Sequence, residues 1–429
     1  MTTPATRHPA SALWPLLLPP SEHGRDASVA VSAHGTRVEL TGGRTVLCGT
    51  SGLWNVNLGY GDAAVERAVV DALREASYLP LFRREHTYAR AAADALVGLC
   101  GPERYGRVMF TTSGGSANDL AMKLARLYQV IAGRSRRRLV VGLQGSYHGL
   151  TFGAHALTGE ELGQELYGVD SRLVRHVPPN DVDALRAFMA RYADAVAAIV
   201  VEPVLGSGAV ELSAAFVAEL VRLRDEHDVL LVADEVATGF GRTGPAFASD
   251  EWPGAPDLLL LSKALTNGTA AGSAVVLGHR VAEALVGADA VVVHAETHAG
   301  APTTCAAASA VVRRMEEGDV LQAGQRVADA LERGLDVLGD EPWLAGTSGR
   351  GCFRGLTLRA ADGQLLPPGD VPVVVRHVRD AGALVQPGVH GVQLVPALVY
   401  TDAEVDELLD AVATGMSAYL ARATASSVA

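Results

Sequence analysis

Between about residues 105 and 280, short apolar runs alternate with longer stretches that have one apolar and one polar face. The apolar runs are rich in valine and leucine and carry few charges, which is typical of parallel strands buried on both faces. Each longer stretch has the length and outline of an amphipathic helix. Strands are expected at 108–111, 139–143, 198–201, 229–232 and 258–261, and helices at 117–128, 181–192 and 214–227. This alternation predicts an α/β domain with a doubly wound, mainly parallel sheet.

The pattern changes after about residue 303. A long alanine-rich helix is expected there, followed by a short segment at 350–358 and a final helix at 402–420. A chain of 429 residues is long enough for more than one core. We therefore expect three parts: an N-terminal segment, 1–55, that joins the small domain, a large domain at 56–302, and a small α+β domain at 303–429.

Four of the predicted strands are followed directly by polar residues. In an open α/β sheet, ligands collect beyond the carboxyl ends of the strands. The first strand leads into the small residues Ser113 to Ser116 and then a helix, whose free backbone N–H groups suit a phosphate. The other three strands end at Glu202, Asp234 and Lys263. The sequence thus predicts a phosphate cradle, carboxylates and a lysine along one edge of the sheet.

Lysine is almost absent from this chain. Only two of its 36 basic residues are lysines, Lys123 and Lys263. Arginine stays protonated, whereas a desolvated lysine can lose its proton and attack a carbonyl. A lysine at the end of a leucine-rich strand is therefore a candidate nucleophile; the alternative is a buried structural cation paired with a carboxylate. Lys123 lies in the middle of a predicted helix beside Arg126, so we interpret it as a surface residue.

Five motifs, in order along the chain, carry a resemblance to a known family. They are Tyr147-His148-Gly149, Glu202-Pro203, the signature DEVATGFGRTG at 234–244, the segment SKALTNG at 262–268, and THAGAP at 297–302. With these motifs the chain, from about residue 51 to 409, resembles the class III (omega-type) aminotransferases, pyridoxal-phosphate (PLP) enzymes of fold type I. More weakly, it resembles aminotransferases of daptide-type ribosomal peptide pathways.

The resemblance implies a role for each motif. Lys263 would be the Schiff-base lysine and the base that moves a proton between substrate and cofactor. Asp234 would keep a proton on the pyridine nitrogen, because a nearby carboxylate favours the charged ring. Tyr147 would stack on one face of the ring, and Val236 would lie against the other. Glu202 would belong to the same cofactor site.

The remaining cofactor contacts concern the phosphate. Ser113, Gly114, Gly115 and Ser116 would form its loop, and Thr297 would reach the phosphate of a neighbouring subunit. A homodimer with shared active sites follows from that role. Family members carry serine and glutamate where this chain has Gly115 and Ser116. The lost hydroxyl at Gly115 leaves more of the binding to backbone N–H groups, Ser116 and Thr297, so the cofactor affinity could be lower than usual.

A second departure concerns the substrate. The segment around Gln386 matches a family segment in which an arginine that binds substrate carboxylates stands at that position. Glutamine cannot form a bidentate ion pair. The positions that align with the substrate pocket are Leu53, Trp54 and Phe82, which suit an amine, a ketone or a bulky aldehyde. The alternative is that Arg83 or Arg84 takes over the carboxylate.

These observations lead to one hypothesis and three rivals. We expect transfer of an amino group from an amine or amino-acid donor to a ketone or aldehyde, with a ketone at a modified peptide C-terminus, as in natural-product biosynthesis, as one acceptor. Another fold type I reaction, by a decarboxylase or an aminomutase, would share Lys263 and Asp234. A nicotinamide-dependent oxidoreductase lacks its glycine fingerprint here. An inactive PLP-fold partner protein would not need an intact Lys263 and Asp234.

Composition narrows the setting. The net charge of −12 argues against nucleic acid as a partner. The four cysteines are scattered, without the spacing of metal ligands, so neither a metal nor a disulfide framework is expected. No apolar run approaches the roughly 20 residues needed to span a bilayer. We expect a cytoplasmic enzyme that does not bind membranes.

Overall fold

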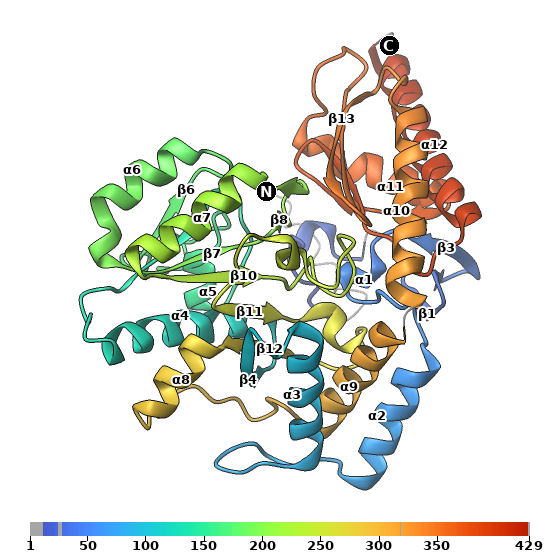
Figure 1. Cartoon of the computed structure of the whole chain (residues 1–429). Coiled ribbons are helices and arrows are strands. Elements are labelled where there is room, and N and C mark those ends of the chain that lie inside the picture. The colour runs from blue at the N-terminus through green and yellow to red at the C-terminus, as the bar shows by residue number, and fades with distance from the viewer. Residues whose placement is uncertain (1–11, 25–27, 318, 428–429) are drawn as a thin grey trace, which may run out of the picture.

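A seven-stranded sheet forms the centre of the larger part of the molecule (Figure 1). The computed structural model describes residues 12–24, 28–317 and 319–427. The strand order is β4-β12-β11-β10-β7-β5-β6. In that order the strands span Tyr105–Thr111, Ser273–Gly278, Leu258–Leu261, Leu230–Asp234, Val196–Val201, Leu139–Leu143 and Val174–Val177. Because β10 pairs in parallel with both β11 and β7, the carboxyl ends of these strands meet at one edge.

Helices cover both faces of this sheet, as the alternating pattern predicts. The buried side chains of α4 (Gly114–Ile131) and α8 (His279–Gly287) pack on one face. Those of α6 (Val182–Tyr192) and α7 (Ala214–His227) pack on the other. The mainly parallel, doubly wound α/β fold is confirmed.

Side-chain caps fix where three of these helices begin. The hydroxyl of Ser113 accepts the backbone N–H of Ser116 at the start of α4, and Ser213 caps α7 in the same way. The carboxylate of Asp181 caps α6. A side-chain oxygen at this position satisfies an N–H group that has no partner within the helix. The observed helices therefore begin within a few residues of the expected ones.

Two strands of the sheet were not among those expected. Strand β6 is a short edge strand whose centre is polar, Arg175-His176, so it lacks an apolar run. Strand β12 is fully buried but runs antiparallel to both β11 and β4. Its direction depends on its pairing with these two strands and not on any hydrophobic period.

Another sheet joins strands from the N-terminal part of the chain to a strand near its C-terminal part. Strands β1 (Ala30–His34), β2 (Arg37–Leu40) and β3 (Arg44–Cys48) form a sheet that β15 (Ala383–Leu384) completes by pairing with β3. A third sheet has the order β13-β14-β17-β16, with the strands spanning Leu344–Arg350, Phe353–Leu358, Gly391–Leu394 and Gln386–Pro387. Figure 1 shows α10 (Asp319–Leu338), α11 (Val371–Ala381) and α12 (Asp402–Ser427) beside this sheet.

Helix α9 (Pro302–Glu316) lies close to the boundary expected at 302/303. It packs against α2 (Ala63–Glu75) and α3 (Thr87–Cys100), which belong to the larger part of the molecule. The division at 1–55, 56–302 and 303–429 stays a proposal. Within the described residues, no helix is long and apolar enough to cross a membrane.

Candidate active site

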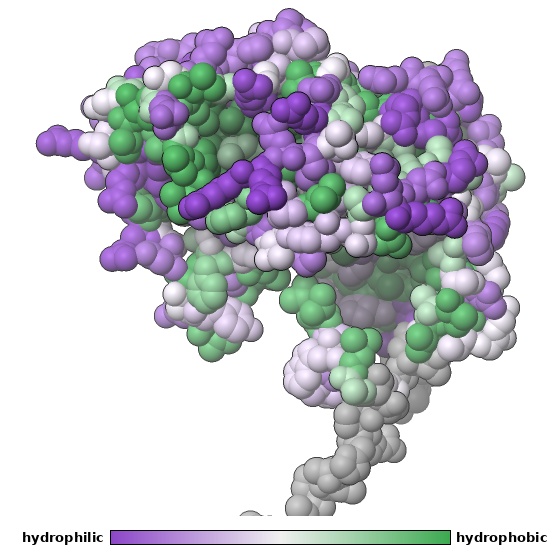
Figure 2. All heavy atoms as spheres, turned by 90° about the horizontal axis from the view of Figure 1, so that it is seen from below, coloured by the Kyte–Doolittle hydropathy of each residue, from purple (hydrophilic) through white to green (hydrophobic). Residues whose placement is uncertain are grey.

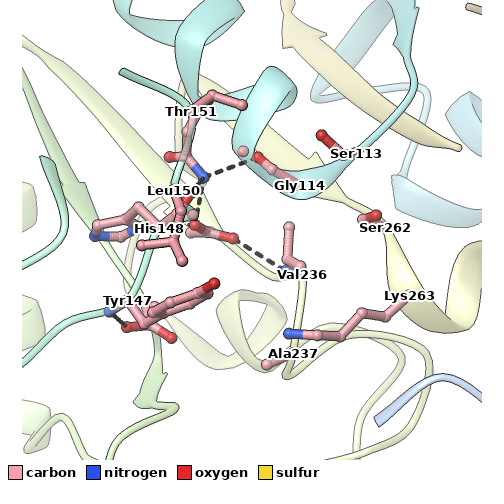
Figure 3. A pocket seen from close by; sticks show the side chains of 15 residues that line it. Ser113, Gly114, Tyr147, His148, Leu150, Thr151, Val236, Ala237, Ser262 and Lys263 are labelled. Atoms are coloured by element: carbon pink, nitrogen blue, oxygen red, sulfur yellow. Dashed lines mark hydrogen bonds and ion pairs between the residues drawn. The ribbon is translucent and has the colours of Figure 1, made fainter. Parts of the chain in front are cut away.

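A cavity of about 460 Å³ opens at the carboxyl edge of the large sheet. The start of α4 lines one side, and the segments that follow β5, β7, β10 and β11 line the others. Figure 3 shows side chains from these segments pointing into the same space. The lining residues are Ser113, Gly114, Gly115, Asn118, Tyr147, His148, Gly149, Leu150, Thr151, Glu202, Asp234, Val236, Ala237, Ser262 and Lys263. The structure thus brings together residues that the sequence places more than 100 positions apart.

Lys263 extends into this cavity from the end of β11 (Figure 3). Burial lowers the pKa of its ammonium group, and the charges of Asp234 and Glu202 act in the opposite direction. Within the described part of the chain, no carboxylate lies within ion-pair distance of Lys263, so the alternative of a structural ion pair is not supported. A lysine with a lowered pKa can reach the neutral, nucleophilic form at a lower pH.

Asp234 is held by three hydrogen bonds. One carboxylate oxygen accepts the Nδ1–H of His148 at 2.7 Å and the side-chain amide of Asn118 at 2.8 Å. The other accepts the backbone N–H of Val236 at 3.2 Å. Burial alone would lower the pKa of His148, but its hydrogen bond to Asp234 and the charge of that carboxylate raise it. The pair therefore keeps a negative carboxylate in a buried position.

His148 and Asn118 hydrogen-bond to Asp234, and the sequence analysis did not single them out. His148 belongs to the Tyr147-His148-Gly149 motif, and Asn118 lies at the start of α4, two residues after Ser116. Their signal was weak, because a polar residue inside a motif does not reveal which atom it contacts. Only the fold places both on the oxygen of Asp234.

Glu202 is a buried carboxyl group that accepts only backbone hydrogen bonds. The N–H groups of Tyr147 and Gly206 donate to its two oxygens at 2.8 Å and 3.0 Å. Burial raises the pKa of Glu202 to about 7. The ring of Tyr147 stands at the cavity, and Figure 3 shows Val236 at a different side of the same space.

The phosphate cradle differs in one respect from the expectation. Gly114 and Gly115 line the cavity, and a Cβ atom on Gly114 would lie 3.0 Å from Val236. The hydroxyl of Ser116, however, donates to the carboxylate of Glu296, and the backbone N–H of Ser116 donates to the hydroxyl of Ser113. Ser116 is not among the residues that line the cavity, and the prediction that it takes over phosphate binding stays a proposal.

Thr297 also lies outside the cavity of its own chain. Its side chain is exposed, and its carbonyl oxygen accepts the hydroxyl of Tyr78 at 2.8 Å. Gln386 lies in β16, opposite Gln393 of β17, and does not line the cavity either. The described structure therefore leaves the expected roles of Thr297 and Gln386 as proposals.

None of the expected substrate residues is among those that line the cavity, and only Trp54 lies close to Lys263. Leu53 and Phe82 are 52% and 65% exposed, whereas Trp54 is largely covered. The indole ring of Trp54 is centred 5.1 Å from the Nζ of Lys263. Arg83 stacks on Phe82 at 5.3 Å, and both Arg83 and Arg84 are exposed.

Leu53 and Trp54 sit on a strained turn. The φ angles from Ser51 to Trp54 are +44°, +53°, +69° and +60°, so four consecutive residues adopt the left-handed conformation. Only Gly52 does so without a steric cost, which for other residues is roughly 1–2 kcal/mol each. Such a turn persists only when the surrounding structure holds it.

The size of the cavity and the groups that line it fit PLP. Its volume is within the usual range for a small-molecule site, roughly 300–1,000 Å³. The start of α4 offers N–H groups for a phosphate, and the carboxylate of Asp234 can accept a hydrogen bond from a protonated ring nitrogen. Nε2 of His148 and Oδ1 of Asn118 are buried without a hydrogen-bond partner among the described residues. Lys263 completes the set as the amine for the aldehyde.

The comparisons with known proteins agree with this geometry. A model of the family described as aminotransferase class-III matches residues 21–415. An omega-aminotransferase of Caulobacter vibrioides is 29% identical over 94% of this chain and 96% of its own length. An acetylornithine aminotransferase of Mycobacterium tuberculosis is 33% identical over 90% and 91%. The crystal structure of an amine transaminase from an uncultivated Pseudomonas species, in a PLP-bound form, is 28% identical with a TM-score of 0.90, over 95% of this chain and 99% of that one.

Proposed function

Because the chain belongs to the class III aminotransferases, we propose that it moves an amino group from an amine or amino-acid donor to a ketone or aldehyde. The protein is a PLP-dependent aminotransferase, and the proposal concerns its substrates and residues. The observation that supports the assignment most directly is Lys263, which is half-buried at the cavity, with a lowered pKa and no ion-pair partner in the described structure.

The residues divide the work between them. PLP, when bound, supplies an aldehyde for the amine and a ring that accepts electrons. Lys263 would take and return the proton at the reacting carbon, because its Nζ reaches into the cavity. Asp234, oriented by His148 and Asn118, would hold the proton of the ring nitrogen. Gly114 and Gly115 would direct their N–H groups to the phosphate.

The acceptor we favour is a ketone at the C-terminus of a modified peptide. Gln386 stands where a carboxylate-binding arginine is expected, and the expected pocket residues Leu53 and Phe82 are exposed apolar side chains. A large neutral ketone suits these groups better than a small keto acid does. A screen of amine donors against peptide ketones, bulky ketones and free keto acids tests this proposal. Amination of keto acids alone would overturn the peptide acceptor, and product without amino exchange would indicate a decarboxylase or aminomutase instead.

Introducing the missing arginine is expected to change the acceptor preference. Gln386→Arg should lower the KM for an α-keto acid such as pyruvate roughly tenfold, because a charged, bidentate hydrogen bond stabilises binding by about 1.5–3 kcal/mol. Steady-state kinetics with pyruvate and a neutral ketone measure the effect. Gln386→Lys is the matched control. It adds the charge without the planar guanidinium group that binds a carboxylate through two hydrogen bonds, so it should lower the KM for pyruvate less. An unchanged KM for pyruvate would mean that residue 386 does not face the substrate, or that Arg83 or Arg84 already serves it.

Restoring a hydroxyl to the phosphate loop is expected to tighten cofactor binding. A Cβ atom on Gly115 would lie 3.3 Å from Thr151 and 3.6 Å from Gly149, so serine fits with a small adjustment. One added hydrogen bond to the phosphate contributes about 0.5–1.5 kcal/mol. Gly115→Ser should therefore lower the Kd for PLP roughly 2- to 10-fold in equilibrium dialysis with the apoenzyme. Gly115→Ala fills the same space without a hydroxyl, and equal tightening by both variants would contradict the explanation.

We also propose that two copies of the chain share their active sites. Thr297 is exposed and lies outside its own cavity, which suits a residue that serves a neighbour. Figure 2 shows apolar side chains exposed beside hydrophilic ones on one face of the molecule. The large apolar side chains that are exposed include Leu53, Tyr78, Leu79, Phe82, Val291 and Val293. Light scattering of the purified protein tests the dimer, and a monomer with full activity would exclude shared sites.

A cytoplasmic location remains part of the proposal. All four cysteines are buried and unpaired. Free thiols of this kind suit a reducing compartment.

A further inference from the structure

The guanidinium group of Arg242 is completely buried at the junction of three segments. No carboxylate within the described ranges lies at ion-pair distance from it. Its Nη1 donates to the carbonyl oxygens of Cys352, at 3.2 Å, and Pro396. Its Nη2 donates to the hydroxyl of Ser51, at 3.1 Å, and to the side-chain oxygen of Asn57. One buried cation thus joins the N-terminal segment, the signature motif and the C-terminal part of the chain.

Ser51 extends these contacts to the strained turn. Its hydroxyl accepts from Arg242 and donates to the carbonyl oxygen of Val395 at 2.6 Å. The N–H of Val395 donates back to the carbonyl oxygen of Gly49, two residues before Ser51, at 2.7 Å. The start of the left-handed turn is therefore tied to the C-terminal segment by a hydroxyl that Arg242 orients.

The turn at 51–54 brings the side chain of Trp54 close to Lys263. Trp54 packs edge-on against Phe353, with ring centroids 6.0 Å apart, and its indole lies 5.1 Å from the Nζ of Lys263. The side-chain amide of Asn55 donates to the carbonyl oxygens of Gly52 and Leu53, which closes the turn from within. Because the local backbone is strained, these outside contacts decide whether the turn keeps its shape.

We propose that Arg242 is a positioning residue that fixes the turn at 51–54, and with it Leu53 and Trp54, at the substrate side of the cavity. The inference rests on the proposed function, which assigns both side chains to the substrate. It explains why a cation is buried without a carboxylate. Four acceptors, two from residues 51–57 and two from the C-terminal part of the chain, converge on one planar guanidinium group, which only arginine provides. The charge of Arg242 also acts, after burial, to lower the pKa of Lys263.

Two variants separate this role from general stability. Ser51→Ala removes the hydroxyl between Arg242 and Val395 and leaves the buried cation in place. Arg242→Lys keeps the charge but cannot reach four acceptors. We expect amide hydrogen exchange at residues 50–55 of the PLP-bound enzyme to become about tenfold faster in both. The KM for a bulky amine, 1-phenylethylamine, should rise about tenfold, whereas kcat for isopropylamine stays within twofold.

Ser348→Ala is the matched control. The hydroxyl of Ser348 also donates to a backbone carbonyl oxygen, that of Gly208, at 2.8 Å, but it does not contact the turn. This variant should keep the exchange at 50–55 and both kinetic constants of the unaltered protein.

The outcomes decide the proposal in either direction. Unchanged exchange at 50–55 and an unchanged ratio of the two KM values in Ser51→Ala would overturn it, even if Arg242→Lys failed to fold. Equal changes in Ser348→Ala would also overturn it, because the effect would then reflect any lost domain contact. If the unaltered protein accepted neither amine, the proposed function would fail, and the exchange measurement would still decide the role of Arg242.

Discussion

Lys263→Ala is expected to abolish amine transfer, with a loss of roughly 10³- to 10⁴-fold or more in kcat. The variant removes the amine that holds the aldehyde and the base that moves the proton, and no other lysine lines the cavity. Burial already lowers the pKa of the Lys263 ammonium group, so the neutral amine forms with less cost than on the surface. A spectrophotometric assay with an amine donor and a ketone acceptor measures the loss.

The near absence of lysine makes the control unusually clean. Lys123→Ala removes the only other lysine of the chain, which is exposed and donates to the carbonyl oxygen of Val293 at 3.1 Å. That variant should keep its activity. Borohydride reduction of the PLP-bound enzyme should attach the cofactor mass to the peptide that contains residue 263 in both the unaltered protein and Lys123→Ala. A label on the Lys123 peptide, or one that survives Lys263→Ala, would refute the assignment.

Asp234→Asn is expected to lower kcat by on the order of 10²- to 10³-fold while PLP still binds. An amide of the same shape keeps the site filled but cannot hold a positive charge on the ring nitrogen. It also takes the negative charge away from His148, whose pKa that carboxylate raises. Single-turnover kinetics and the visible spectrum of the bound cofactor measure the two effects separately.

The control for Asp234→Asn is the neighbouring carboxylate. Glu235 is equally buried, but it accepts the hydroxyl of Thr238 and the backbone N–H of Ser249 and does not line the cavity. Glu235→Gln should therefore cost stability and leave kcat of the folded protein within a few fold. If both variants lost the same factor in kcat, the special role of Asp234 would be contradicted.

Much of the proposed cofactor site could be predicted from the sequence, because each of its parts is a short pattern of neighbouring residues. Asp234 and Lys263 follow apolar runs, and the small residues after Ser113 precede a helix. In a parallel sheet the ends of neighbouring strands meet, so local order along the sequence becomes proximity in space. Hydrogen bonds of Ser113 and Asp181 to helix N–H groups are local as well, which explains why the helix starts agree.

The omissions concern contacts between distant segments. The hydroxyl of Ser116 donates to Glu296, 180 positions away, a contact that no local pattern indicates. The direction of β12 depends on its pairing with β4 and β11 and not on its own apolar residues. A hydrophobic period describes which face of an element is buried, and it does not describe what lies opposite.

The sequence by itself determined the fold class and the cofactor and predicted the roles of Lys263 and Asp234, because strand ends, helix starts and family motifs are encoded in short stretches. Only the tertiary structure decided which neighbours orient them. His148 and Asn118 meet at Asp234, and Arg242 ties the turn at 51–54 to the C-terminal segment. These contacts join residues from tens to more than a hundred positions apart, and their geometry exists only once the chain has folded and water has been excluded from between them.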